Sequence, residues 1–287
     1  MVAGGVVGWA APSTGLEHVI RPVLGALLYV TFLQVPAREL LRSLRDGRFL
    51  AAALVVNFVL VPLVVAAMFP LLPASQAVRL GALLVLLCPC VDYVIVFSGL
   101  AGGSSGRLLA ATPLLLIAQM LLLPLYLLLF LGSGLAHVVA AGPFVTAFLT
   151  LIALPLALAW ATQAWTPRLK DPASTAMVPL MAATLFVVVA SQVPTLHHGL
   201  ADVIGVVPLY AGFLVVMAFV GLAVAKVFRL DTPAGRAVVF TGATRNSLVV
   251  LPLALALPAN PAVVVTQTLV EVIGMVLYVR VVPRLLP

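Results

Sequence analysis

Three charged residues stand in the middle of apolar stretches that are long enough to cross a membrane. They are Asp92, Arg245 and Glu271. A charged side chain at the centre of a bilayer costs about 2.5–3.5 kcal/mol on insertion scales. Three such residues in one small chain therefore indicate a path for a substrate or an ion.

Two of these charges lie beside residues that weaken a helix. Asp92 follows the run 88–90 (Cys-Pro-Cys), and Arg245 lies within 241–247 (Thr-Gly-Ala-Thr-Arg-Asn-Ser). Proline removes a backbone N–H group, and Gly, Thr, Asn and Ser lower helix propensity. We therefore expect both stretches to unwind there, and we count Thr244 and Asn246 with Arg245 as candidate substrate-binding residues.

Broken helices that cross bring together half-helix ends of opposite partial charge. Asp92 and Arg245 could neutralise these ends, and they could also pair with each other. The alternative for Asp92 is that its carboxyl group itself binds a proton or a cation. Both roles remain open from the sequence.

Glu271 lies in the last apolar stretch, one helical turn after Gln267. Side chains four residues apart share a helix face, so the two can line one cavity. A buried carboxyl group of this kind suits a proton carrier, and the alternative is a packing role through hydrogen bonds to neighbouring helices. We assign Glu271, Asp92 and Gln267 as candidates for ion or proton coupling.

The only two cysteines, Cys88 and Cys90, flank a proline in the fourth apolar stretch. Two residues apart, they are poorly placed for a structural disulfide and are interpreted as free thiols. Buried cysteine often acts as a small apolar residue. Beside an unwound helix, a thiol is also a plausible ligand for a thiophilic solute.

The composition places the whole chain in a membrane. Of its 287 residues, 64% are hydrophobic and 8% are charged, whereas soluble domains average about 25% charged residues. There is no room for a soluble nucleotide-binding domain, and no P-loop, serine triad or zinc-enzyme motif occurs. We expect no enzyme activity, no cofactor and no structural metal. The net charge of +7 lies in short loops and not in a nucleic-acid patch.

Apolar stretches of helical length recur along the sequence and predict nine to ten transmembrane helices in a single membrane domain. Most basic residues fall in loops on one side, which predicts a multi-pass protein of the plasma membrane with both termini in the cytoplasm. The first stretch is too short to span the bilayer alone. The stretches are residues 2–11, 16–35, 49–72, 80–100, 108–131, 143–165, 176–194, 203–227, 238–257 and 263–282.

The two halves of the chain, about 1–132 and 141–287, follow the same pattern of stretches. Five helices per repeat is an odd number, so the second repeat must be inverted. Inverted repeats with interrupted helices at matching positions are typical of secondary transporters. We therefore predict an all-α fold of two inverted five-helix repeats, in which broken helices four and nine cross.

The chain resembles the bile acid/sodium symporter superfamily, and in particular its arsenite-efflux permease branch. The resemblance rests on residues 57–63 (NFVLVPL), 90–97 (CVDYVIVF) and 240–247 (FTGATRNS), with the later 269–272 (LVEV). It implies ten helices in two inverted repeats, with crossing broken helices four and nine. It also implies that a cysteine of helix four and a glutamate of helix ten matter for transport, which here are Cys90 and Glu271.

The expected function is secondary transport that exports arsenite or a related trivalent metalloid in exchange for protons. Sodium is disfavoured because Arg245 places a fixed positive charge where a sodium ion would bind. The alternative is transport of a small organic anion whose carboxylate is bound by Arg245, because a guanidinium fork fits a carboxylate. A sensory or structural protein without transport is a third reading.

Overall fold

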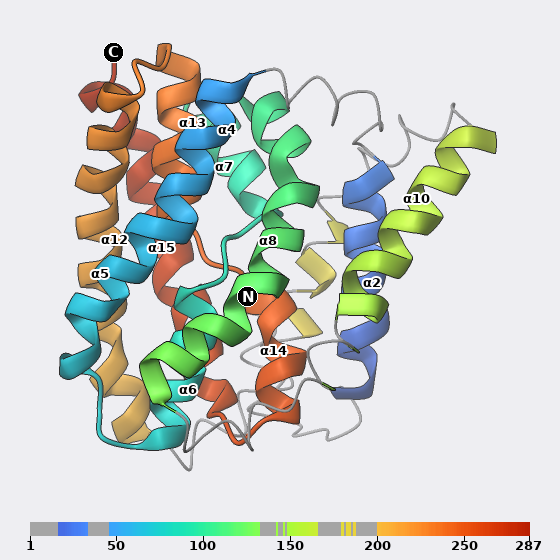
Figure 1. The fold of residues 1–287 in the computed structure, drawn as a ribbon, viewed down its shortest axis with the longest axis vertical. Coiled ribbons are helices and arrows are strands. Elements are labelled where there is room, and N and C mark those ends of the chain that lie inside the picture. The colour runs from blue at the N-terminus through green and yellow to red at the C-terminus, as the bar shows by residue number, and fades with distance from the viewer. Residues whose placement is uncertain are drawn as a thin grey trace.

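The computed structural model describes residues 17–33, 46–132, 142, 146, 148–165, 179–180, 182–184, 186–187 and 200–287. All elements named within these residues are helices (Figure 1). They are α2 (Glu17–Leu33), α4 (Gly47–Val55), η2 (Val56–Leu60), α5 (Val61–Met68), η3 (Phe69–Leu71), α6 (Gln76–Leu86), α7 (Tyr93–Leu100), α8 (Ser105–Leu131), η5 (Phe148–Ala153), α10 (Leu154–Trp165), α12 (Leu200–Val227), α13 (Thr232–Ala243), α14 (Ser247–Ala256) and α15 (Pro261–Leu285).

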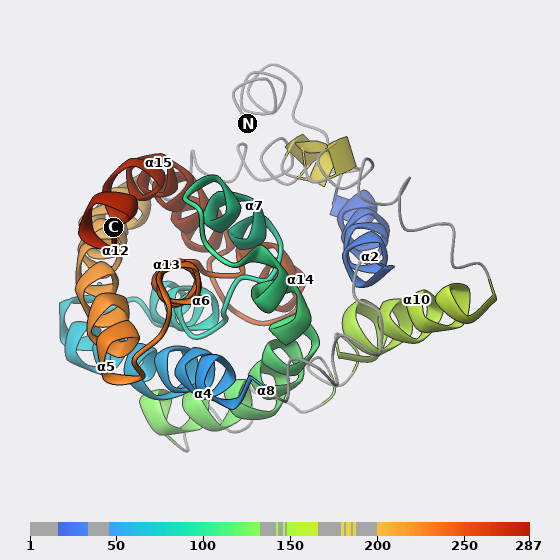
Figure 2. The same cartoon turned by 90° about the horizontal axis from the view of Figure 1, so that it is seen from above.

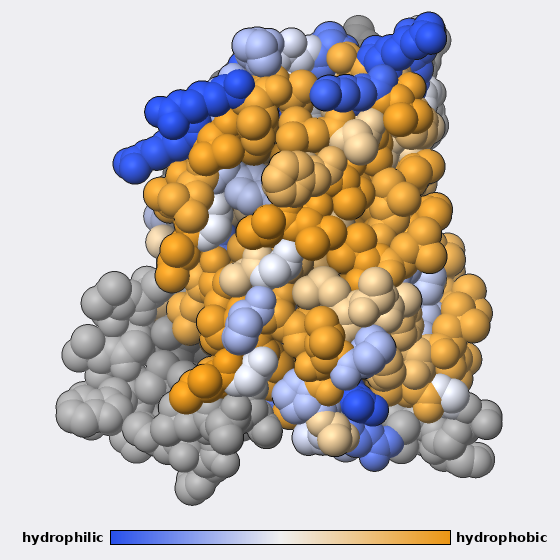
Figure 3. Space-filling model, turned by 90° about the vertical axis from the view of Figure 1, so that its left-hand side faces the viewer, coloured by the Kyte–Doolittle hydropathy of each residue, from blue (hydrophilic) through white to orange (hydrophobic). Residues whose placement is uncertain are grey.

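Four of the described helices are long and apolar enough to cross a membrane. They are Gly47–Leu71, which runs through α4, η2, α5 and η3, then Ser105–Leu131, Val203–Val227 and Pro261–Leu285. Each agrees with a stretch expected from the sequence. Figure 3 shows the corresponding broad apolar surface, with hydrophilic residues gathered towards its ends. The prediction of a multi-pass membrane protein is confirmed.

Two further stretches are each divided into a pair of half-helices, as their sequences predict. Helix α6 ends at Leu86 and α7 begins at Tyr93, while α13 ends at Ala243 and α14 begins at Ser247. Seen from above, α6 and α13 lie in the middle of the bundle, and α4, α5, α12, α15, α7 and α8 surround them (Figure 2). The first half of each interrupted helix thus lies at the centre of the bundle.

Helices α2 and α10 lie together at one side of this bundle (Figures 1 and 2). The hydroxyl groups of Tyr29 and Thr162 are hydrogen-bonded at 3.0 Å. The Gln163 amide donates to the carbonyls of Phe32 and Leu33 at the end of α2. Polar contacts between apolar helices are a common means of association in membranes, where the hydrophobic effect does not drive it.

The long span Gly47–Leu71 contains a π-helical turn, η2, at its middle. Pro62 follows this turn and has no N–H group to offer the Phe58 carbonyl in an α-helical register. The Tyr126 hydroxyl of α8 donates to that carbonyl at 2.6 Å. The turn also contains Asn57, which is fully buried and points into the bundle towards Thr241 of α13.

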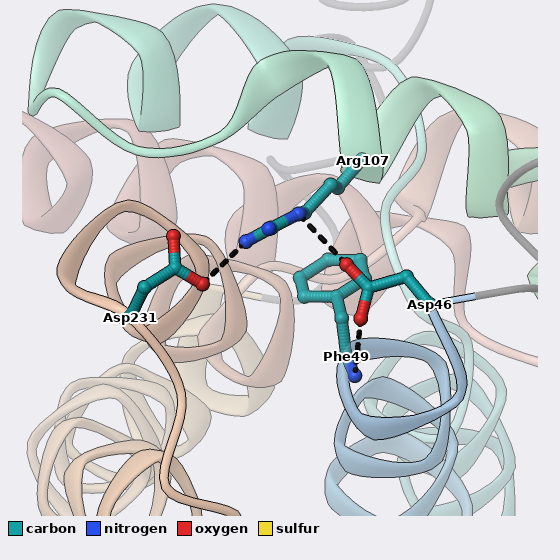
Figure 4. Close-up of polar contacts among 4 residues, drawn as sticks. All are labelled: Asp46, Phe49, Arg107 and Asp231. Carbon is teal, nitrogen blue, oxygen red and sulfur yellow. Dashed lines mark hydrogen bonds and ion pairs between the residues drawn. The ribbon is translucent and has the colours of Figure 1, made fainter.

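One end of the bundle is held by an ion-pair network (Figure 4). The Arg107 guanidinium contacts Asp46 at 2.9 Å and Asp231 at 2.6 Å. Asp46 and Asp231 precede the first residues of α4 and α13, and Arg107 lies in the first turn of α8. Carboxylates are favourable at helix N-termini. Through its two ion pairs, Arg107 joins the starts of α4, α13 and α8.

Several predictions concern residues outside the described part of the chain. They include the short stretch 2–11, most of 176–194 and the position of the N-terminus. The count of nine to ten helices and the inverted repeat therefore stay predictions. Within the described residues, a long helix, an interrupted helix and a second long helix follow one another in each half of the chain.

Candidate functional site

The two breaks, residues 87–92 and 244–246, lie against each other at the centre of the bundle and are called the crossing below. The Cys90 N–H group donates to the Thr244 carbonyl at 3.2 Å, and the Asn246 N–H group donates to the Cys88 carbonyl at 2.8 Å. These bonds form an antiparallel bridge between Pro89 and Arg245. Unwound backbone at membrane depth needs hydrogen-bond partners, and each break supplies them to the other.

The Arg245 side chain is completely buried and lies at the C-terminal ends of two half-helices. Its Nη2 atom donates to the carbonyls of Thr241 and Gly242 at 2.8 Å each, near the end of α13. Its Nη1 atom donates to the Leu86 carbonyl at 3.3 Å, at the end of α6. Helix C-termini carry partial negative charge, so the guanidinium has the compensating place expected from the sequence.

Two contacts from neighbouring helices complete the surroundings of this guanidinium. The Asn57 side-chain oxygen accepts from Nη2 of Arg245 at 2.8 Å. The guanidinium carbon lies 5.6 Å from the centre of the Phe213 ring in α12, a distance typical of a cation–π contact. Neither Asn57 nor Phe213 was assigned to the site from the sequence.

Asp92 is buried and precedes the first residue of α7, but its side chain makes no capping hydrogen bond. Its Oδ1 atom has no hydrogen-bond partner. The expectation that Asp92 and Arg245 could pair directly is wrong, because no ion pair joins them among the described residues. The arginine lies at helix C-termini and the aspartate at a helix N-terminus, so each meets the partial charge opposite to its own.

Glu271 of α15 reaches the crossing and accepts three hydrogen bonds there. The Tyr93 hydroxyl donates at 2.6 Å, the Arg245 backbone N–H group donates at 2.7 Å, and the Gln267 amide donates to the same carboxylate. The prediction that Gln267 and Glu271 share a helix face is confirmed. Tyr93 also donates to the Arg245 carbonyl at 3.1 Å. The carboxylate is therefore tied to both interrupted helices.

Both cysteines are free thiols, as predicted, and both are buried in the first break. The sulfur of Cys90 faces the backbone N–H groups of Asp92 and Val94, at the start of α7. Helix N-termini stabilise negative charge. These N–H groups therefore offset part of the cost of burying a negative charge on the Cys90 sulfur. The Cys88 carbonyl accepts the hydrogen bond from the Asn246 N–H group of the second break.

Thr244 and Asn246 both have roles in the local backbone. The Thr244 hydroxyl donates to the Phe240 carbonyl of its own helix at 2.9 Å. The Asn246 side-chain oxygen accepts from the Val249 N–H group at 3.1 Å and so caps the start of α14. Asn246 and Asp92 thus hold corresponding positions, each directly before the second half of an interrupted helix.

Four buried polar atoms in or beside the crossing have no hydrogen-bond partner. Buried polar groups in proteins are paired in the great majority of cases, and each exception costs roughly 1–3 kcal/mol. Two of these atoms are acceptors and two are donors. They are Asp92 Oδ1, Gln267 Oε1, Arg245 Nε and Asn246 Nδ2. The site therefore has hydrogen-bonding capacity left for water, a proton carrier or a polar solute.

The sequence reasoning missed Tyr93, Asn57 and Phe213 as members of the site. Tyr93 directly follows Asp92, and Asn57 is a lone amide in an apolar stretch. Both signals were present, but neither identifies a partner more than a hundred residues away. Phe213 is one of many apolar residues in its helix, so no sequence signal marks it.

Comparison with known proteins identifies a family. Residues 21–199 match the model of the sodium bile acid symporter family, which is more than half of the chain. The match includes the first break with Cys90 and Asp92, and the second break and Glu271 lie beyond it. A search of curated proteins gave no match.

Proposed function

Because the chain belongs to the sodium bile acid symporter family and is a membrane transporter, we propose that it exports arsenite or a related trivalent metalloid in exchange for protons. One observation carries the proposal: the buried Cys90 thiol lies in the crossing among unpaired buried donors and acceptors. Interrupted helices at the centre of a secondary transporter commonly form the substrate site.

The chemistry of arsenite suits this set of groups. Near neutral pH it is arsenous acid, a small uncharged molecule whose hydroxyl groups both donate and accept hydrogen bonds. Asp92 and Gln267 supply free acceptors, and Arg245 and Asn246 supply free donors. The arsenic atom is thiophilic, so Cys90 can exchange its S–H bond for an S–As bond while one arsenic-bound hydroxyl leaves as water. No oxidant or reductant is needed.

The surroundings of Glu271 support the proposed coupling to protons. Three donors point at its carboxylate, two of them from residues of the interrupted helices. A proton on this carboxylate turns one of its lone-pair sites into a donor and removes the negative charge that strengthens the three hydrogen bonds. Protonation therefore loosens the link between α15 and the crossing, which is the coupling required of an antiporter.

Sodium is not part of the proposed cycle, because Arg245 already supplies a positive charge at the crossing. Its Nη2 atom lies 2.8 Å from each of three oxygens, those of Asn57, Thr241 and Gly242. Three oxygens converging on one point are a favourable place for a small cation. With the guanidinium there, a second cation would meet a like charge at short range.

The alternative function, transport of an organic anion bound by Arg245, requires that the guanidinium be free to form a fork with a carboxylate. Both of its Nη atoms already donate to protein oxygens, and the side chain is completely buried. A carboxylate could bind only if helix-end carbonyls gave up these donors. This competition favours the metalloid proposal.

The test is arsenite flux in everted membrane vesicles under imposed pH or sodium gradients. We expect accumulation driven by the proton gradient and unaffected by sodium, and we expect Cys90→Ser and Glu271→Gln each to reduce it at least tenfold. Asp46→Asn is the matched control, because it removes a carboxylate at the start of α4, away from the crossing, and should keep the flux. Full flux in both crossing variants, at equal protein level, would overturn the proposal.

A further inference from the structure

A second candidate site lies on the outside of the bundle, away from the crossing. Helix α5 and the second half of α8 enclose an apolar groove of about 550 Å³, called the α5–α8 groove. Its walls are aliphatic and aromatic, and they include Phe58, Leu63, Phe69, Tyr126 and Phe130. The groove lies on the side of the bundle away from α2 and α10 (Figure 2).

The groove faces the lipid. It follows the span Gly47–Leu71, and three of its lining residues, Val59, Leu63 and Leu129, are 49%, 61% and 71% exposed. From Phe58 to Phe69 a helix rises about 16 Å, roughly half the thickness of the hydrocarbon core of a bilayer. The dimensions fit one acyl chain lying along one leaflet.

A positive charge marks one end of the groove. The Arg79 guanidinium stacks on the Phe69 ring at 5.2 Å, and its Nε atom donates to the Pro73 carbonyl at 3.0 Å. The Phe69 ring in turn packs against Phe130 across the groove. Among the described residues no carboxylate forms an ion pair with Arg79. The arginine is therefore held in place while its charge is available to a ligand.

A second positive contribution comes from the backbone. Arg79 belongs to the first turn of α6, whose N-terminus carries partial positive charge. The connection between α5 and α6 lies at the lower edge of the molecule in Figure 1, at the end where the span Gly47–Leu71 finishes. This is the depth at which lipid phosphates lie, since the span fills the hydrocarbon core.

We propose that the α5–α8 groove binds one anionic phospholipid, with an acyl chain along the groove and the phosphate on Arg79 and the start of α6. The apolar walls, the groove length and the unpaired charge at its end match the two parts of such a lipid. A second copy of this chain would match the apolar walls, but it would also have to bring a carboxylate to Arg79.

The test is native mass spectrometry of the purified full-length chain with equal amounts of phosphatidylglycerol and phosphatidylcholine. We expect about fivefold preferential retention of phosphatidylglycerol, as one basic contact at a membrane surface provides. Arg79→Gln should remove the preference. Ala66→Phe fills the groove from α5 and keeps Arg79, and it should reduce retention of both lipids. Arg284→Gln removes an equal charge at the other end of the molecule and should leave the preference unchanged.

Two results would overturn the proposal. One is an undiminished preference for phosphatidylglycerol in Arg79→Gln, or an equal loss in Arg284→Gln, since either makes the attraction non-specific. The other is a lipid-free dimer that Ala66→Phe dissociates, which would assign the groove to a second copy. Gel filtration of each variant shows that it is folded before its lipid is measured.

Discussion

Replacing Arg245 by methionine removes the charge at the crossing while keeping a long, flexible side chain. Four buried acceptors then lose a donor: the carbonyls of Leu86, Thr241 and Gly242 and the side-chain oxygen of Asn57. At roughly 1–3 kcal/mol for each unsatisfied group, the loss is about 4–12 kcal/mol. That is a large part of the total stability of a folded protein, about 5–15 kcal/mol.

The helix itself cannot replace these bonds. The N–H groups of Arg245 and Asn246, which would serve the Thr241 and Gly242 carbonyls in a continued helix, donate instead to Glu271 and Cys88. Water is also scarce at this depth. We therefore expect Arg245→Met to lower the free energy of unfolding by at least about 4 kcal/mol.

The assay is thermal unfolding of the purified chain in a mild detergent. At about 2–4 °C for each kcal/mol, we expect Arg245→Met to lower the midpoint by at least about 8 °C. Arg236→Met is the matched control, because Arg236 also donates to carbonyls, those of Ala101 and Leu286, but is only partly buried near an end of the bundle. Water can replace it there, so we expect a shift below about 3 °C. Equal small shifts in both variants would refute the reasoning.

Two further variants separate the roles of hydroxyl groups. Tyr93→Phe removes one donor from the Glu271 carboxylate, and a hydrogen bond to a charged group contributes about 1.5–3 kcal/mol. We therefore expect proton-driven arsenite flux to fall about tenfold or more. An unchanged flux in vesicles would contradict the coupling role. Tyr126→Phe leaves the Phe58 carbonyl without its donor. We expect the free energy of unfolding to fall by about 1–3 kcal/mol while the flux stays normal. Reduced flux at unchanged stability would instead assign Tyr126 a role in transport.

Local chemistry explains which features of the site could be predicted from the sequence. The first break follows from Pro89, and the second follows from a run that includes Gly242 and Asn246. The pairing of Gln267 with Glu271 follows from helical geometry within one turn. Each of these inferences needs only neighbouring residues.

The partners across the bundle could not be predicted in the same way. Tyr93 and Glu271 are 178 residues apart, and Asn57 and Arg245 are 188 residues apart. Their contacts depend on how the helices pack, which the periodicity of apolar residues does not specify. The suggested pairing of Asp92 with Arg245 was wrong for a related reason. Opposite charges attract, but each was already close to a helix end of the opposite polarity.

The charge balance of the crossing bears on which carboxyl group carries the proton in the proposed cycle. The crossing holds one cation, Arg245, and two carboxyl groups, Asp92 and Glu271. Buried net charge is costly, so electroneutrality is reached when one carboxyl group carries a proton. Glu271 accepts three hydrogen bonds, which favour its carboxylate form, whereas the Asp92 Oδ1 atom accepts none.

In the proposed cycle, the three hydrogen bonds to Glu271 favour an ionised Glu271 and a protonated Asp92 in this conformation. Moving that proton to Glu271 would keep the crossing neutral but weaken the hydrogen bonds that tie α15 to the interrupted helices. Asp92 would then become a free carboxylate at the start of α7, next to the sulfur of Cys90. In the proposed cycle, water then hydrolyses the S–As bond, returning a hydroxyl group to arsenic and a proton to the Cys90 sulfur. A negative charge beside the sulfur favours this neutral thiol over a thiolate. In this proposal, proton transfer between the two carboxyl groups would connect substrate release to the loosening of the crossing.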